Sequence, residues 1–157
     1  MKTKVYYKKP DKLKIKAKEG FAFVPPGLFQ GLKPGELKKN TKNAQVLMED
    51  KLGKKCYAVR YESKDMRENL QIATIWFDTS NYTIVSTQIE GMGSLTSQWT
   101  YAHIGKYYLP SKITAQMQFS DRRGKHEKMT AIVDFKNYTI NKGLSDSIFK
   151  RTSDKRN

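Results

Sequence analysis

The chain has 157 residues and a mass of 18.2 kDa, which predicts a single domain of ordinary size. Its one cysteine, Cys56, excludes an internal disulfide and a cysteine-rich metal site, and no apolar run reaches the roughly 18 residues of a transmembrane helix. The net charge is +15, and 24 of the 30 basic residues are lysine. Because arginine is the usual partner of guanine edges and bidentate phosphate contacts, this balance predicts no specific nucleic-acid site.

Alternation of apolar and polar residues begins at the start of the chain. Residues 2–8 and 12–18 are predicted to be strands joined by a turn at Pro10. In the second strand Leu13 and Ile15 alternate with lysines, so one face is apolar and the other is solvated.

Residues 21–43 break this alternation with an apolar segment that contains three prolines. Pro25 and Pro26 exclude a long regular element, and Pro34 is expected to start a short helix that ends near Lys39. Two interpretations of the segment stay open. It is either a functional loop or a loop that covers the end of a sheet.

From residue 44 onward, predicted strands follow one another at regular spacing, separated by turns rich in Gly, Asp and Asn. Such spacing indicates an antiparallel sheet or barrel. Residues 1–149 are interpreted as one domain, followed by a charged tail over residues 150–157. The strands are expected at residues 44–49, 55–62, 70–77, 82–90, 95–104, 109–119 and 129–138.

No catalytic group, metal site or cofactor site is predicted, and we expect the protein not to be an enzyme. His103 and His126 are the only histidines, and spacing identifies no catalytic or metal-binding partner for either. Gly91 and Gly93 lack the further glycine and the helix of a dinucleotide-binding loop. Cys56 lies in an alternating strand, which predicts a buried and inert thiol.

Large aromatic side chains are too numerous for one thin sheet face that few helices cover. Trp76, Trp99, Tyr101, Phe119 and Phe135 belong to this surplus. Either other elements or a ligand must cover such a face. A sheet that curls around unfilled apolar space forms a lipid-type pocket, and the alternative is a fully packed small barrel.

Segments spread over nearly the whole chain resemble, in order, those of the LolA-like outer-membrane lipoprotein-sorting proteins. Residues 5–15 are similar to the family's early hairpin, which has an aromatic strand, a basic residue, a proline and an alternating strand. Residues 75–78 with 83–85 resemble its central hairpin, residues 107–113 its later strand with a Leu-Pro entry, and residues 138–149 its closing segment.

This resemblance implies a mainly β fold, an antiparallel and incompletely closed β-barrel (half-barrel) with few short helices in its loops. It also implies a carrier of lipid or lipoprotein acyl chains in the periplasm or cell envelope, with a hydrophobic cavity. Family members begin with a signal peptide and one or two helices, so we expect this part to be removed or truncated here. The family's basic residue before the proline is commonly arginine, whereas Lys9 here lacks arginine's planar set of hydrogen bonds.

Strand phase and the apolar segment then supply candidate residues for such a cavity. The candidate lid residues are Phe21, Phe23, Leu28, Phe29 and Leu32. The candidate wall residues are Leu13, Ile15, Trp76, Leu95, Trp99, Tyr101, Ile113 and Met117.

The expected partners are acyl chains and, through the lysine-rich face, an anionic membrane surface. No partner protein is identified. A second hypothesis is a cell-envelope protein-binding or sensory module with a packed interior and no lipid cargo, which would recognise its partner by strand addition at a sheet edge. A third is a nucleic-acid-binding barrel, which predicts aromatic residues beside lysines on one face. Leu13 and Ile15 instead face away from the lysines of their strand.

Overall fold

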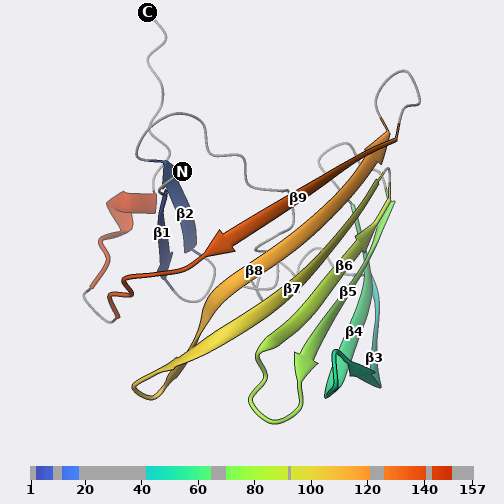
Figure 1. The fold of residues 1–157 in the computed structure, drawn as a ribbon, viewed down its shortest axis with the longest axis horizontal. Helices are drawn as coiled ribbons and strands as arrows, with labels where there is room; N and C mark the ends of the chain where they lie inside the picture. The colour runs from blue at the N-terminus through green and yellow to red at the C-terminus, as the bar shows by residue number, and fades with distance from the viewer. Residues whose placement is uncertain are drawn as a thin grey trace, which may run out of the picture.

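The computed structural model is mainly β and describes residues 3–8, 12–17, 42–64, 70–91, 93–120, 126–140 and 143–149. The strands in these ranges form two antiparallel sheets (Figure 1). In chain order the elements are β1 (Thr3–Lys8), β2 (Lys12–Ala17), β3 (Lys42–Lys51), β4 (Lys54–Lys64), β5 (Leu70–Asp78), β6 (Ile84–Glu90), β7 (Gly93–Ile104), β8 (Tyr107–Ser120), β9 (His126–Asp134) and the 3-10 helix η2 (Asp146–Phe149).

Each strand of the larger sheet pairs with its neighbours in sequence. The strand order is β3-β4-β5-β6-β7-β8-β9, so β3 and β9 form the two edges, and the sheet does not close into a barrel. Strands β1 and β2 form a separate two-stranded sheet. The prediction of a mainly β, antiparallel and incompletely closed architecture is therefore confirmed.

The end of β9 is the clearest departure from the predicted strands. A strand was expected over residues 129–138, whereas β9 spans His126–Asp134. Asn137 has a φ of 58°, in the left-handed region that a strand does not use. The Phe135 N–H group still donates to the Ser111 carbonyl at 2.9 Å. The regular strand thus ends at Asp134, and the chain keeps one further backbone hydrogen bond to β8 before it turns at Asn137.

Strand β6 also begins later than predicted, because Tyr82 has a φ of 57° and belongs to the preceding turn. Just after this turn the pairing of β5 with β6 shifts between Trp76 and Phe77. Val85 is the extra residue of the resulting bulge. Ile84 and Val85 are consequently both buried, but in different clusters.

A second register shift lies between β7 and β8. Thr100 is opposite Lys112, whereas Tyr101 is opposite Pro110, so Ser111 is the extra residue. A proline is tolerated at such a bulge because its missing N–H group is not required by the ladder.

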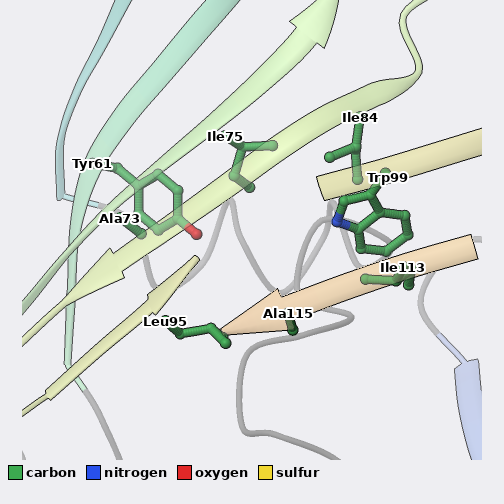
Figure 2. Close-up of a cluster of buried hydrophobic side chains, with 8 residues drawn as sticks. All are labelled: Tyr61, Ala73, Ile75, Ile84, Leu95, Trp99, Ile113 and Ala115. Carbon is green, nitrogen blue, oxygen red and sulfur yellow. The ribbon is translucent and has the colours of Figure 1, made fainter. Parts of the chain in front are cut away.

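Alternation along the strands gives the larger sheet an apolar face and a polar face. The apolar face carries the larger buried cluster (Figure 2), and the polar face carries a smaller one. The apolar-face cluster consists of Tyr61, Ala73, Ile75, Ile84, Leu95, Trp99, Ile113 and Ala115, and the polar-face cluster consists of Cys56, Ala58, Trp76 and Val85.

The hairpin of β1 and β2 is attached to the C-terminal part of the described chain. Figure 1 shows η2 beside this hairpin, away from the larger sheet. The Lys8 Nζ donates to the Leu144 carbonyl at 3.0 Å and to Asp146 at 2.7 Å. Lys12 forms a second ion pair with Asp146 at 2.8 Å. Residues near the two ends of the chain are thereby brought together.

Candidate functional site

Strand register arranges the apolar face in three rows that cross β7, β8 and β9, and two of these rows continue onto β6. The middle row is made of small side chains, whereas both flanking rows are made of larger ones. The middle row contains Thr87, Ser97, Ala115 and Ala131, one flanking row contains Ile89, Leu95, Met117 and Met129, and the other contains Trp99, Ile113 and Val133.

The hydroxyl groups of the middle row satisfy one another. The Ser97 Oγ lies 2.6 Å from the Thr87 Oγ1 and accepts a hydrogen bond from the Trp99 Nε1 at 2.8 Å. All three residues are buried. These contacts fix the Trp99 indole against the middle row and leave mainly apolar atoms for any further contact.

Burial along the apolar face decreases toward β9. Ile113 and Ala115 on β8 are 0% and 1% exposed. On β9, Ala131 and Val133 are half-buried and Met129 is 39% exposed. The middle row is therefore most accessible at its β9 end.

Tyr61 extends one flanking row to β4, because it is opposite Ala73, and Ala73 is opposite Ile89. Its side chain is 3% exposed, and its hydroxyl group has no hydrogen-bond partner within the described structure. Burial raises the pKa of Tyr61 to about 12. The phenol therefore stays protonated at neutral pH.

Tyr101 stabilises the bulge at the start of β6. Its hydroxyl accepts a hydrogen bond from the Ile84 N–H group at 3.1 Å, and its ring stacks on Trp99 with centroids 6.4 Å apart. Burial raises the pKa of Tyr101 well above its usual value. Tyr101 thus links two strands of the apolar face.

Five of the predicted wall residues come together on this face. Leu95, Trp99 and Ile113 belong to its buried cluster, and Tyr101 and Met117 pack against that cluster. Leu13 and Ile15 lie instead on β2, in the separate two-stranded sheet.

Trp76 does not join the other wall residues, and its assignment to their face was wrong. It alternates with Ile75, which faces the apolar cluster, so the Trp76 side chain lies on the polar face. Its Nε1 donates to Glu49 at 2.9 Å, and the Lys51 Nζ lies 3.9 Å from its ring centroid. It also lines an open pocket of about 190 Å³ together with Leu47, Glu49, Ala58, Arg60, Ile72, Thr74, Gln88 and Glu90.

Several functional candidates were missing from the prediction. Ser97 lies midway between the predicted wall residues Leu95 and Trp99. Ala115 lies in the same way between Ile113 and Met117. Alternation along each strand was therefore enough to place both residues on the apolar face. The unpartnered hydroxyl of Tyr61 had no signal in the sequence, because it depends on the packing of several strands.

Other predicted features lie outside the described residues. These are the lid residues Phe21, Phe23, Leu28, Phe29 and Leu32, the family's basic position Lys9, the short helix over residues 34–39 and the tail over residues 150–157.

Asp78, at the end of β5, is a buried carboxylate that accepts three hydrogen bonds. It is 6% exposed and accepts hydrogen bonds from Lys54 at 2.8 Å, from the Ser80 N–H group at 2.9 Å and from the Ser80 hydroxyl at 2.6 Å. The bonds from Lys54 and then Ser80 lower the pKa of Asp78 to about 2. All these partners belong to the turn and its neighbouring strand, so Asp78 is a structural residue.

The cysteine and the histidine His103 lie in parts of the chain that the structure describes. Cys56 is 0% exposed, as predicted for an inert thiol, and burial is the main reason that its pKa is raised. The exposed His103 ring contacts Tyr108, with centroids 4.9 Å apart. Across the described residues, no three His, Cys, Asp or Glu side chains are grouped so that they would hold a metal ion.

Comparison with known proteins gives no assignment. A scan against protein-family models, a search of curated proteins and a search of solved structures each find no match. In the part of the chain that the structure describes, no helix has the length and apolarity needed to span a membrane.

Proposed function

We propose that this protein is a carrier that binds acyl chains of lipids or lipoproteins noncovalently on the apolar face of its larger sheet. The observation that carries the proposal is the middle row of small side chains between two rows of large apolar ones. A linear acyl chain suits such a row, because its methylene groups contact the row and both flanks. Each methylene removed from water contributes about 0.8 kcal/mol, so a few are enough for useful affinity.

The resemblance to the LolA-like family supports the same proposal from the sequence side. Residues 5–15 and 107–113 resemble segments of that family, whose members carry acyl chains in the periplasm. We infer a periplasmic or cell-envelope location and lipoprotein sorting or lipid transport as the process.

Lipid extraction tests the proposal most directly. The purified protein is extracted with organic solvent for lipid mass spectrometry, and native mass spectrometry of the intact protein gives the stoichiometry. We expect about one lipid per chain, which would also identify the cargo class. A clean extract, together with no binding of fatty-acyl probes by the same protein, would contradict the carrier function.

A pair of variants locates the binding surface. Ala131→Phe fills the accessible end of the middle row, whereas Thr130→Phe places the same side chain on the exposed polar face of β9. Filling the row displaces about two methylenes of a bound chain, so we expect roughly a tenfold loss of affinity for acyl probes in Ala131→Phe. Thr130→Phe should bind as the wild type does. Equal affinities in the two variants would place the ligand elsewhere.

The edge strand β3 favours a second candidate function, the binding of a partner protein by strand addition. Val46, Leu47 and Met48 are 64%, 48% and 68% exposed, so apolar side chains emerge on both faces of an unpaired edge. Such an edge offers backbone groups and apolar contacts to an added strand. This candidate takes precedence if the extraction yields no lipid and acyl probes do not bind.

A further inference from the structure

The hydroxyl group of Tyr61 lies within the apolar cluster without an acceptor. In Figure 2 it points from β4 toward the other labelled side chains. Among the described residues it is the one buried side-chain polar atom that makes no hydrogen bond. A buried donor that lacks an acceptor destabilises the folded state, so its retention in a core requires a reason. A ligand that supplies the acceptor is such a reason.

The surroundings of Tyr61 determine which acceptor is suitable. Its neighbours along the flanking row are Ala73, Ile89, Leu95 and Met117, all of them uncharged. Burial is the cause of its raised pKa of about 12, with no contribution from a charged neighbour. An ionised carboxylate would lose its hydration here without a cation to compensate. An ester or amide carbonyl brings an acceptor without bringing a charge.

We propose that the Tyr61 hydroxyl donates a hydrogen bond to the uncharged carbonyl of a bound acyl group. The protein then selects ester-linked or amide-linked acyl chains over free fatty acids and alkyl ethers. The inference rests on the proposed function and adds the orientation of the ligand. The acyl carbonyl lies at the β4 side of the apolar face, and the hydrocarbon chain extends along the middle row toward β9.

Two lipids that differ only in this carbonyl test the selectivity. 1-Monopalmitoylglycerol has an ester carbonyl, and 1-O-hexadecylglycerol has an ether in its place. Affinities are measured by displacement of the fluorescent probe anilinonaphthalene sulfonate. One neutral hydrogen bond gained in a buried site corresponds to a preference of about three- to tenfold for the ester in the wild type. In Tyr61→Phe the ratio of the two affinities should fall to about one.

The thermal stability of the ligand-free protein provides an independent readout. Tyr61→Phe keeps the ring and removes the unpartnered hydroxyl, so we expect its Tm to rise. Tyr138→Phe is the matched control, because the Tyr138 hydroxyl donates to the Pro110 carbonyl. Its Tm should fall, and its preference for the ester should equal that of the wild type.

The outcomes separate this inference from the proposed function. If neither lipid displaces the probe from the wild type, the carrier function itself fails. If both lipids bind but Tyr61→Phe keeps the wild-type ratio, only the role of Tyr61 is overturned. A lower Tm in Tyr61→Phe would also overturn it, because the hydroxyl would then have a partner in the ligand-free protein.

Discussion

The Ser97 hydroxyl takes part in two buried hydrogen bonds on the apolar face. It contacts Thr87 at 2.6 Å and accepts from Trp99 at 2.8 Å, and the residue is 1% exposed. Ser97→Ala removes both of these buried hydrogen bonds, so we expect a loss of about 1–3 kcal/mol in the free energy of unfolding. Urea denaturation measures this loss. Thr96→Ala, at the neighbouring exposed position, should change the stability by less than about 0.5 kcal/mol.

Asp78 makes stability depend on acid pH. Its pKa of about 2 in the folded protein lies below the usual aspartate value of 3.8, so its ionised form stabilises the fold above about pH 4. This contribution is lost as the pH falls from about 4 to about 2. At pH 7 we expect Asp78→Asn to be less stable than the wild type by about 1–2 kcal/mol.

Denaturation curves at several pH values check the assignment of Asp78. The stability difference between wild type and Asp78→Asn should shrink as the pH is lowered below about 4, because the wild-type carboxylate is then protonated. Asp134→Asn, at an exposed position on β9, serves as the control. A difference that stays constant over this pH range would show that the Lys54 and Ser80 contacts do not depend on the charge of Asp78.

At the residue level, strand phase grouped five of the predicted wall residues correctly and assigned Trp76 to the wrong face. Phase relates residues within one strand, so it placed Leu95 with Trp99 and Ile113 with Met117. It does not relate one strand to another, because register and bulges decide that relation. Trp76 was assigned to the wrong face on this account, since the register pairs it with Ser86 and Ser86 with Gln98, whose side chain lies on the face opposite Trp99.

At the level of elements, the hairpin of β1 and β2 depends on Asp146 for its attachment. Lys8 and Lys12 both pair with this carboxylate, and all three side chains are at least 42% exposed. We expect Asp146→Asn to increase amide hydrogen exchange in β1 and β2 without changing exchange in the larger sheet. High salt should have a similar effect on the wild type, because exposed ion pairs are screened. Unchanged exchange in the hairpin would show that other contacts hold it.

The β3 edge predicts concentration-dependent association. A long edge strand with exposed apolar residues can pair with a second chain through its free backbone groups and its apolar side chains. Met48→Lys adds a charge at a position that is 68% exposed, so we expect several-fold weaker association in sedimentation velocity experiments. Gln116→Lys adds the same charge at an exposed position of β8, which is paired on both sides, and should have no such effect. Equal association of the two variants would remove β3 as the contact.

The alternation of apolar and polar residues predicted where most strands lie, but it did not predict where each strand begins and ends. Strands β4 and β5 lie within a few residues of the predicted ranges, because each has a long alternating pattern bounded by turn residues. The beginning of β6 and the end of β9 depend on Tyr82 and Asn137, which adopt left-handed conformations. Short sequence patterns do not specify those conformations, which result from the turn and its packing.

At the level of the whole molecule, the charge predicts binding to anionic membranes. Residues 1–55 contain 15 lysines and 5 acidic residues, which is +10 of the total +15. We expect co-sedimentation with vesicles that contain phosphatidylglycerol and little with pure phosphatidylcholine. Binding should fall several-fold between about 50 and 300 mM salt, because the Debye length shortens below about 10 Å. Salt-independent binding would exclude electrostatic attraction as its cause.

The consecutive strand order of the larger sheet bears on how the chain folds. Each strand from β3 to β8 pairs with the next strand along the chain, so this topology allows the sheet to grow by one hairpin at a time. Contacts that are local in sequence require little loop-closure entropy, and chains with such contacts fold faster than β proteins with distant pairings. The contact of Lys8 with Asp146, in contrast, joins residues that are 138 positions apart in the sequence. A nascent chain can therefore assemble the sheet in order of synthesis, and the two ends join only after the last strand is complete.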